Sequence, residues 1–458
     1  MIEETYGVLS LLPIAVIVVT AILIKRVIEP LVLGTLVATI LLSGYAFFPK
    51  WVESLLETMS DPDVVWTMVI PALFGILIAM FDRSNSGEAF RNLALKFVKS
   101  KPNSLLATYI LGIIIFMDEY MNALLIGGTM RNLTDKFKVP REVLAYVTNS
   151  TGTPVSVLIP FSSWAVFLMG LYASSGIDSG NGFGTYVTSI PFMVYPMISL
   201  LIVLLFIYNK VPKTKYIKNA VKRAESGNVF PESRSMESDE FEEEIQKGSS
   251  NKKTPKLVNF ILPIIMLIAG TLIFDMDLII GVMISIATCF ILYSLNGTMT
   301  YSELFDTSIK GIQDMVDMIV LIIAIFLLVS LNEELGTIEF VISTVEPLIT
   351  AALLPGITLL VVAFLGFTTG NYWGTMGIVL PIILPLAQAG DVSIPLMLGA
   401  MVSGGVFGSQ VCFFGDAVTL TSASTQVGNI DQIKVAIPYA LSALILSFFI
   451  FIGLGFII

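Results

Sequence analysis

The chain has 458 residues, of which 55% are hydrophobic and only 13% are charged, and its mean hydropathy is +0.87. Soluble domains carry about 25% charged residues, so this composition excludes a water-soluble enzyme and predicts an integral membrane protein. The 25 Lys and Arg residues form no basic patch that would favour nucleic-acid binding. Cys289 and Cys412 lie in apolar segments, so neither a disulfide nor a cysteine-ligated metal is expected. Histidine is absent, which leaves proton chemistry to carboxylates.

Apolar runs long enough to cross a bilayer, which takes about 20 residues, recur along the whole chain. They are residues 8–24, 30–48, 64–81, 186–208, 257–274, 278–295, 311–332 and 435–457. Three further regions, 104–130, 143–173 and 357–426, are apolar but interrupted by polar residues, Gly or Pro. We therefore expect an all-α polytopic membrane protein with broken helices near the midplane.

The positions of Lys and Arg predict the orientation of these runs. Lys25 and Arg26 follow the first run, whereas residues 49–63 are mainly acidic, so the amino terminus is expected outside the cell. The region 104–130 has cations at both ends, and a single crossing cannot keep both ends inside. We therefore expect a re-entrant hairpin from the cytoplasm here and a second hairpin, 357–388, from outside. About ten helices then cross the cytoplasmic membrane, and both termini lie outside.

Residues 209–256 form one long polar stretch that begins with cations and passes into an acidic run. Its low hydrophobicity favours partial disorder, and a solvated connector is a more common use of such a segment than a regulatory domain. We interpret it as a charged cytoplasmic linker between two units, residues 1–208 and 257–458.

The two units show the same order of elements: three helices, two broken apolar segments and a final helix. A constant shift of 253 residues aligns Asp118 with Asn371, Tyr120 with Trp373, Ser150 with Ser403, Gly152 with Gly405, and Ser163 with Asp416. Each unit has an odd number of crossings, so the second runs opposite to the first. This is the inverted-topology repeat of many secondary transporters.

Four breaks are expected to meet in one place, because irregular backbone at membrane depth must be covered by protein or line a cavity. They lie at 118–122, 149–154, 368–375 and 403–409, and they are rich in hydroxyl, amide and carbonyl oxygens, which hard cations such as Na⁺ prefer. The candidate ion- or substrate-binding residues are Asn122, Asn149, Ser150, Thr151, Thr153, Thr369, Asn371, Ser403, Ser409 and Thr419. No catalytic residue and no cofactor is expected.

Carboxylates inside the membrane are the candidates for coupling Na⁺ to H⁺. Asp118 and Glu119 are adjacent, and burial with mutual repulsion would let Na⁺ and H⁺ compete there; a solvated surface loop is the alternative. Asp416 lies between apolar residues, where a structural helix contact is the alternative. Asp314 and Asp317 are interpreted as acids in the first turn of a helix, where the positive end of the helix dipole stabilises negative charge. Candidate Na⁺ ligands are Asp118, Asn149, Ser150, Thr151 and Asp416.

Three stretches carry a family resemblance: Phe-Met-Asp-Glu-Tyr-Met-Asn at 116–122, Met130 to Asp135, and Arg141 to Trp164. They resemble the NhaC-type sodium/proton antiporter family of the ion-transporter superfamily. The resemblance implies a secondary transporter of ten to twelve helices with two hairpins, forming a homodimer in which a transport domain moves past a scaffold. The Asn-Ser-Thr break at 149–151 is similar to the sodium motifs of related carboxylate carriers.

The second unit departs from the family pattern, which has an acid, a base and two threonines where this chain has Ser409, Gln410, Ala417 and Val418. The predicted function is exchange of Na⁺ for H⁺. The alternative is a sodium- or proton-coupled carrier of a small amino acid or organic acid, and an ion channel is a third, less fitting class. The expected partners are the lipid bilayer, Na⁺, H⁺ and, in the alternative, a small organic substrate, with no nucleic acid.

Overall fold

The computed structural model describes residues 6–24, 28–84, 89, 98–175, 182–231, 256–274, 277–337, 340, 351–370, 372–413 and 415–457. All regular elements within these ranges are helices, which confirms the expected all-α membrane fold. Eight helices are long and apolar enough to cross a membrane, or ten if each of two bent pairs forms one span. The eight include both arms of the expected second hairpin.

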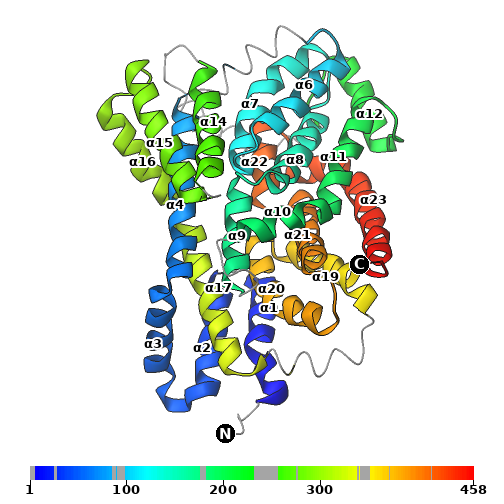
Figure 1. Ribbon diagram of the computed structural model, residues 1–458. Helices are drawn as coiled ribbons and strands as arrows, with labels where there is room; N and C mark the ends of the chain where they lie inside the picture. The colour runs from blue at the N-terminus through cyan, green and yellow to red at the C-terminus, as the bar shows by residue number, and fades with distance from the viewer. Residues whose placement is uncertain are drawn as a thin grey trace.

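The first half of the chain contains eleven labelled helices, listed here in order (Figure 1). They are α1 (Leu12–Ile24), α2 (Ile28–Ser43), α3 (Phe47–Ser60), α4 (Pro62–Arg83), α6 (Lys101–Ile114), α7 (Glu119–Lys136), α8 (Arg141–Leu158), α9 (Ser163–Ser174), α10 (Phe183–Ser189), α11 (Val194–Ile207) and α12 (Lys215–Glu225).

The second half repeats this order after the polar stretch. Its helices are α14 (Val258–Ile273), α15 (Leu278–Leu295), α16 (Tyr301–Asp314), α17 (Val316–Glu334), α19 (Leu354–Thr369), α20 (Tyr372–Ala389), α21 (Ile394–Val411), α22 (Asp416–Thr425) and α23 (Asn429–Gly455).

The shift of 253 residues that aligned a few side chains also aligns the helices. It carries α7 onto α20 and α8 onto α21 with identical bounds, and α3 onto α16 within one residue. In Figure 1 the helix pair α6 and α7 lies in the upper part of the molecule, and the equivalent pair α19 and α20 lies in the lower part. The equivalent pairs therefore lie toward opposite ends of the molecule, as an inverted repeat requires.

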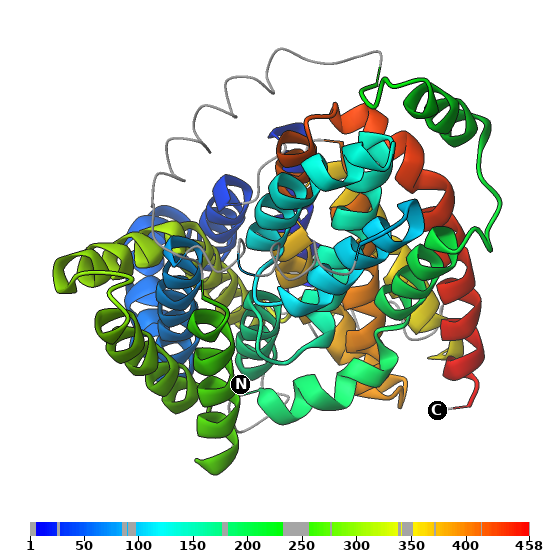
Figure 2. The ribbon, with the colours of Figure 1, turned by 90° about the horizontal axis from the view of Figure 1, so that it is seen from above.

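The helices form two regions that lie side by side in both views (Figures 1 and 2). One region, which we call the arm, consists of α1–α4 and α14–α17; α4 packs on α15, α16 and α17. The other, the core, consists of α6–α11 and α19–α23, and α8 packs on α7, α11, α22 and α23. Each region combines helices from both halves of the chain. Helix pairs α4 with α9 and α17 with α20 join the arm to the core.

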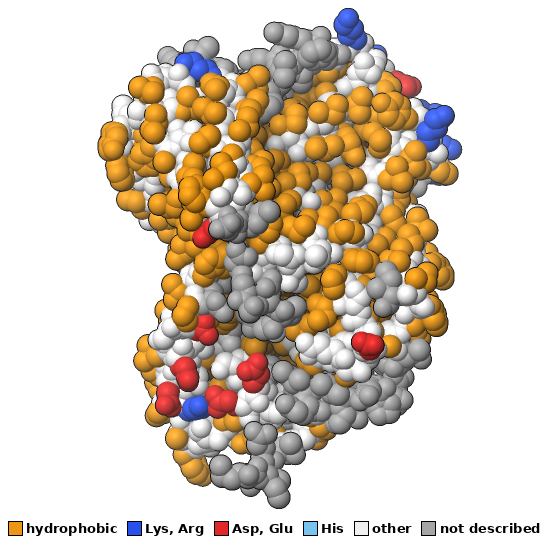
Figure 3. Space-filling model, in the orientation of Figure 1, with side chains coloured by type: hydrophobic (Ala, Val, Ile, Leu, Met, Phe, Trp, Pro, Cys, Tyr) orange, Lys and Arg blue, Asp and Glu red, His pale blue; other side chains and the backbone are white. Residues whose placement is uncertain are grey.

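Charged side chains are unevenly distributed along the long axis of the molecule. Figure 3 shows most visible Lys and Arg side chains at the upper end and most visible Asp and Glu side chains toward the lower end, with apolar surface between them. The hairpin α6–α7 belongs to the cationic end (Figure 1). The positive-inside rule makes that end the cytoplasmic one, which remains our prediction for the orientation.

The described part of the polar stretch contains a helix that packs on the core, α12, where the sequence suggested only a connector. Burial raises the pKa of Tyr216, and its hydroxyl donates a hydrogen bond to Asp431 of α23 at 2.9 Å. Arg223 pairs with the fully buried Glu142 of α8 at 2.6 Å. Helix α12 thus links one helix of each half. Residues 232–255, with the acidic run, lie outside the described residues.

Candidate functional site

Asp118 occupies the junction between α6 and α7 and is the N-cap residue of α7. Its Oδ1 accepts hydrogen bonds from the backbone N–H groups of Tyr120 at 2.9 Å and Met121 at 3.0 Å. Its Oδ2 accepts one from the Ser163 hydroxyl at 2.8 Å. A carboxylate in this position satisfies backbone donors and interacts favourably with the positive end of the helix dipole. The carboxylate is therefore held in one orientation.

Glu119, the next residue, points into a different environment. It is only 1% exposed, and its two carboxylate oxygens accept hydrogen bonds from Thr153 at 2.6 Å and from the Tyr372 hydroxyl at 2.5 Å. These partners come from α8 and α20, so one side chain ties together three helices and both halves of the chain. Thr153, a candidate ion- or substrate-binding residue, thus contacts one of the candidate acids directly.

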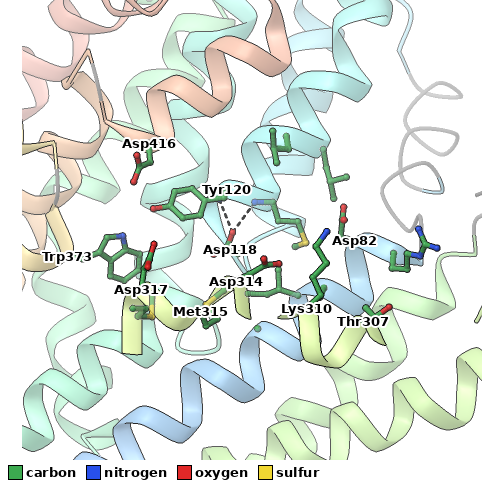
Figure 4. A pocket seen from close by; sticks show the side chains of 18 of the residues that line it. Asp82, Asp118, Tyr120, Thr307, Lys310, Asp314, Met315, Asp317, Trp373 and Asp416 are labelled. Atoms are coloured by element: carbon green, nitrogen blue, oxygen red, sulfur yellow. Dashed lines mark hydrogen bonds between the residues drawn. The ribbon is translucent and has the colours of Figure 1, made fainter. Parts of the chain in front are cut away.

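A cavity of about 710 Å³ lies between the arm and the core (Figure 4). Asp118 and Tyr120 of α7, Trp373 of α20 and Asp416 of α22 line it from the core side. The Tyr120 hydroxyl points toward Asp416, the first residue of α22. Two acids predicted from the sequence, one from each half, therefore face the same space. Glu119 is not among the residues that line this cavity.

The arm supplies further charged residues to the cavity, from α4, α16 and α17. These residues are Asp82, Arg83, Glu303, Asp306, Lys310, Asp314 and Asp317. The sequence interpretation of Asp317 as a first-turn acid of α17 is correct, but Asp314 is the last residue of α16 instead. A short break at Met315 separates the two helices, which one apolar run had predicted as a single element. Hydrophobic periodicity does not reveal such a break.

Two of the four predicted breaks are continuous helix, which corrects the sequence interpretation. Helix α8 runs through 149–154 to Leu158, and α21 runs through 403–409 to Val411. Helix α8 ends at Leu158 before α9 begins at Ser163, and α21 ends at Val411 before α22 begins at Asp416. Helices α8 and α9 are bent by 42° relative to each other. The glycines serve close packing: a Cβ on Gly404 would lie 2.7 Å from the Leu359 carbonyl. Small residues let buried membrane helices approach in this way.

Most of the other predicted binding residues contact helix backbone rather than the cavity. Asn122 donates to the carbonyls of Gly112 at 2.9 Å and Ile115 at 2.8 Å, which closes the end of α6. Thr151 donates to the Val147 carbonyl at 2.9 Å. The Asn122 contacts join the two helices of the hairpin, and the Thr151 contact lies within α8, so their described role is structural.

Asn149 and Ser403 belong to a polar cluster between α8, α11 and α21. Asn149 donates to the Gln410 carbonyl at 3.1 Å, and the Gln410 amide oxygen accepts from Tyr195 at 2.5 Å. The Ser403 hydroxyl accepts from the backbone N–H of Tyr195 at 3.3 Å. Gln410, which replaces a base of the family pattern, thus organises a buried network inside the core. None of these residues lines the cavity.

The remaining predicted residues are dispersed. Ser150 is buried in α8, Ser409 donates to its own helix at Val406, and Thr369 donates to Leu365. Thr419 is exposed and accepts a hydrogen bond from Asn429 at 3.1 Å. Asn371 lies outside the described residues. The oxygen-lined pocket expected from these side chains is therefore not assembled in this arrangement.

Sequence reasoning missed the aromatic side of the site. Trp373 packs against Trp164 with the rings tilted by 34° and their centroids 4.3 Å apart, and it meets Phe167 edge-on at 4.9 Å. Tyr372 stacks on Trp164 at 5.0 Å while it donates to Glu119. The alignment of Tyr120 with Trp373 was the available signal, because it placed an aromatic residue at each hairpin tip. In the part of the chain described here, no group of three His, Cys, Asp or Glu residues could hold a metal ion.

Broken helices, paired hairpins and buried acids at the junction of two inverted halves define a secondary transporter of the membrane. The sequence profile of the Na⁺/H⁺ antiporter family matches residues 163–456. The chain belongs to this family, which confirms the resemblance seen in the sequence.

Three similar proteins cover different shares of the chain. An uncharacterized protein of Haemophilus influenzae is 26% identical over 100% of this chain and 92% of its own length. The malate-2H⁺/Na⁺-lactate antiporter of Bacillus subtilis is 20% identical over 34% of each chain. The solved structure of Neisseria gonorrhoeae MtrF, from a class of antimetabolite efflux pumps, covers 89% of this chain with a TM-score of 0.54 and 11% identity. This likeness concerns the fold alone, and it covers 83% of the solved chain.

Proposed function

We propose that the protein exchanges Na⁺ for H⁺ across the cytoplasmic membrane, and that Asp118 and Asp416 form its shared cation site. The observation that carries this proposal is that these two acids, one from each half, line one cavity between the arm and the core. Carboxylate oxygens are preferred ligands of hard cations. A site at the interface of two inverted repeats is also where secondary transporters bind their ions.

Exchange follows if Na⁺ and H⁺ compete for the same carboxylates. Asp118 already receives three hydrogen bonds, so its charged form needs only one more partner from the cavity. Na⁺ between Asp118 and Asp416 would displace a proton held there, and a proton would release Na⁺ on the opposite side. The core would move relative to the arm, so that the site opens alternately to the two sides of the membrane. The arms of the two subunits would form the fixed part of a homodimer.

Glu119 is proposed to couple occupancy of the site to that movement. It is adjacent to Asp118 and accepts hydrogen bonds from α8 and α20. Protonation would remove one of its acceptor positions and loosen the contact with Thr153 or Tyr372. The junction between the halves would then rearrange when the charge at the site changes.

A second function is favoured by the size of the cavity: a sodium- or proton-coupled carrier of a small amino acid or organic acid. Small-molecule sites enclose about 300–1,000 Å³, and the volume of about 710 Å³ falls in that range, whereas Na⁺ alone needs far less space. The Bacillus subtilis relative, named as exchanging malate with protons for lactate with Na⁺, agrees with a combined ion and solute carrier.

The test is Na⁺-driven pH change in proteoliposomes that contain the purified protein and a trapped pH dye. A Na⁺ pulse outside should alkalinise the interior, because Na⁺ that enters is exchanged for H⁺ that leaves. Asp118→Asn and Asp416→Asn should each reduce the initial rate on the order of 100-fold, because each removes a charged ligand of the ion. Glu57→Gln on α3, an exposed acid away from the cavity, is the matched control. A wild-type rate in both cavity variants, or no Na⁺ response of the wild type, would contradict the proposal.

A further inference from the structure

The cavity between the arm and the core has two chemically different ends. At the end formed by α4 and α16, Lys310 and Arg83 are the cations that act on Asp82, and Figure 4 shows the Lys310 amine directed toward it. The opposite end is lined by Asp118, Asp416 and, from α17, Asp317. Positive charge is thus confined to the α4–α16 end among the described residues that line the cavity.

The balance of charge over the whole lining decides which solutes fit. Seven of the described lining residues are acids and two are bases, Arg83 and Lys310. Like charges at close range repel, so a dicarboxylate would be repelled throughout most of this space. A group that carries positive charge would be attracted to the end that contains Asp317 and Asp416.

Trp373 provides an independent sign that this end receives a ligand. The residue is only 7% exposed and lines the cavity, and its indole N–H makes no hydrogen bond to another described residue. It is not one of the fully enclosed donors without a partner, a group that includes the Trp164 indole, so it is open to the cavity. A tilted contact with Trp164 and an edge contact with Phe167 fix the position of the ring. Buried indole N–H groups usually find a partner. An acceptor atom on a bound solute would supply one here.

The remaining wall is apolar and suits an aliphatic body. It is formed by the side chains of Ile78, Met121, Leu124, Leu125, Met318 and Leu321. Small-molecule sites combine such a wall with a few convergent polar groups. The volume of about 710 Å³ leaves room for a solute beside a cation.

We infer that the cavity binds an organic molecule with a primary ammonium group on an apolar body, and that Asp317 and Asp416 receive this ammonium beside the Trp373 ring. The ring adds a cation–π contact. This inference rests on the proposed transport function, since it names the solute that the carrier takes. The ammonium group belongs either to an amino acid, whose carboxylate accepts the Trp373 N–H, or to a simple amine.

Three matched probes separate these sources: L-leucine, 3-methylbutylamine, which lacks the carboxylate, and 4-methylpentanoate, which lacks the amine. Binding to the purified full-length protein in detergent is measured by calorimetric titration at millimolar probe and fixed Na⁺. We expect L-leucine, 3-methylbutylamine or both to bind, and 4-methylpentanoate to bind at least about tenfold more weakly. Equal or tighter binding of 4-methylpentanoate, or no binding of either ammonium compound, would overturn the inference.

Variants assign the contacts. Asp317→Asn should weaken binding of the two ammonium probes about tenfold or more, because it removes the negative charge that pairs with the ammonium group. Trp373→Phe keeps an aromatic ring but removes the N–H. It should therefore weaken binding of L-leucine, whose carboxylate accepts that N–H, more than binding of 3-methylbutylamine. Glu57→Gln should leave all titrations unchanged. Wild-type affinity of the ammonium probes in Asp317→Asn would overturn the assignment of Asp317.

Binding in detergent needs no ion gradient, so the result is independent of Na⁺/H⁺ exchange. A wild-type protein that moves protons in response to Na⁺ but binds no ammonium probe refutes only the inference. A protein that binds the probes but shows no Na⁺ response in proteoliposomes refutes the proposed exchange.

Discussion

The two halves of the chain place equivalent helices in inverted positions but give their broken ends different side chains. Glu119 begins α7, whereas Tyr372 begins the equivalent helix α20. One break later the relation is reversed, because α9 begins with Ser163 and the equivalent helix α22 begins with Asp416. At these two positions, an acid in one half corresponds to a neutral hydroxyl donor in the other.

The donors that replace acids also serve the acids that remain. Tyr372 donates to Glu119, its own counterpart in the repeat, at 2.5 Å. Ser163, the counterpart of Asp416, donates to Asp118 at 2.8 Å. A symmetric repeat would crowd four carboxylates at one junction, where their repulsion would oppose ionisation. The difference between the halves teaches that the repeat sets the backbone, while divergence of side chains turns a symmetric junction into stable acid–donor pairs.

The largest effect expected concerns the inversion itself. Single cysteines that replace Lys101, the first residue of α6, and Lys136, the last residue of α7, should react with an impermeant maleimide only from the cytoplasmic side. A cysteine at Gln388, near the outer end of α20, should react only from the opposite side. The native Cys289 and Cys412 are buried and provide little background. Labelling of Lys101 and Lys136 positions from opposite sides would show that this pair crosses the membrane and would remove the inversion.

The next effect concerns Glu119, which joins the halves. Glu119→Ala would leave the buried hydroxyls of Thr153 and Tyr372 without their acceptor. Each buried group left without a partner costs about 1–3 kcal/mol, so the midpoint of thermal unfolding should fall strongly. Glu119→Gln retains one acceptor oxygen and should fold, while Na⁺-driven pH change is lost. Thermal stability of Glu119→Ala equal to that of Glu119→Gln would show that these hydrogen bonds do not hold the halves together.

Helix packing gives a smaller contrast between the halves. A Cβ at Gly404 would lie 2.7 Å from the Leu359 carbonyl, which is fixed backbone, between α21 and α19. At Gly112, between α6 and α8, the nearest atoms that the Cβ would meet belong to one side chain, the Thr151 hydroxyl at 2.5 Å and the Thr151 Cβ at 2.8 Å, and not to backbone. Gly404→Ala should therefore lower the free energy of unfolding of the protein by about 1–3 kcal/mol. Gly112→Ala should lower it by less. Gly128→Ala, with open space around its Cβ, is the control. Equal unfolding temperatures for the first two variants would contradict the backbone argument.

Much of this architecture could be predicted from the sequence, because hydrophobic run length and cation position are local signals. The order of the apolar segments and the two helix pairs were expected from them. The alignment of the two halves gave the expectation that Asp118 and Asp416 converge, and both line one cavity, while their role as an ion site stays a prediction. The glycine, serine and threonine motifs at 149–154 and 403–409 were misread as breaks. Their polar atoms are instead satisfied within helices, as Thr151 is by the Val147 carbonyl. Composition alone does not distinguish tight helix packing from an ion site.

The arm side of the cavity could not be predicted for a different reason. Asp317 lies in the first turn of α17, where an acid is explained by the helix dipole without any ligand. Its place beside the core depends on how α17 packs on α20, and this is a tertiary contact between segments of different regions. The hydrogen bond from the Tyr372 hydroxyl to Glu119 could not be predicted for the same reason, because the two residues are 253 positions apart in the sequence.

The smallest effect expected comes from Ser163, which marks the difference between the halves most directly. Ser163→Ala removes the hydroxyl that donates to Asp118 Oδ2 but keeps the two backbone N–H donors to Oδ1. Asp118 should therefore stay in the cavity with one partner fewer. A hydrogen bond to a charged group contributes about 1.5–3 kcal/mol, but a water molecule from the cavity can replace part of it. We expect a change of about three- to tenfold in the Na⁺ concentration for half-maximal pH change, with little change in the maximal rate. Ser162→Ala, which removes the N-cap hydroxyl of α9 one residue earlier, is the matched control, since that side chain contacts Ala165 and Ser156 backbone rather than Asp118. It should lower stability and leave the Na⁺ dependence unchanged. If both variants altered Na⁺ dependence equally, the position of α9 would matter rather than the hydroxyl, and the pairing of Ser163 with Asp118 would have no part in ion recognition.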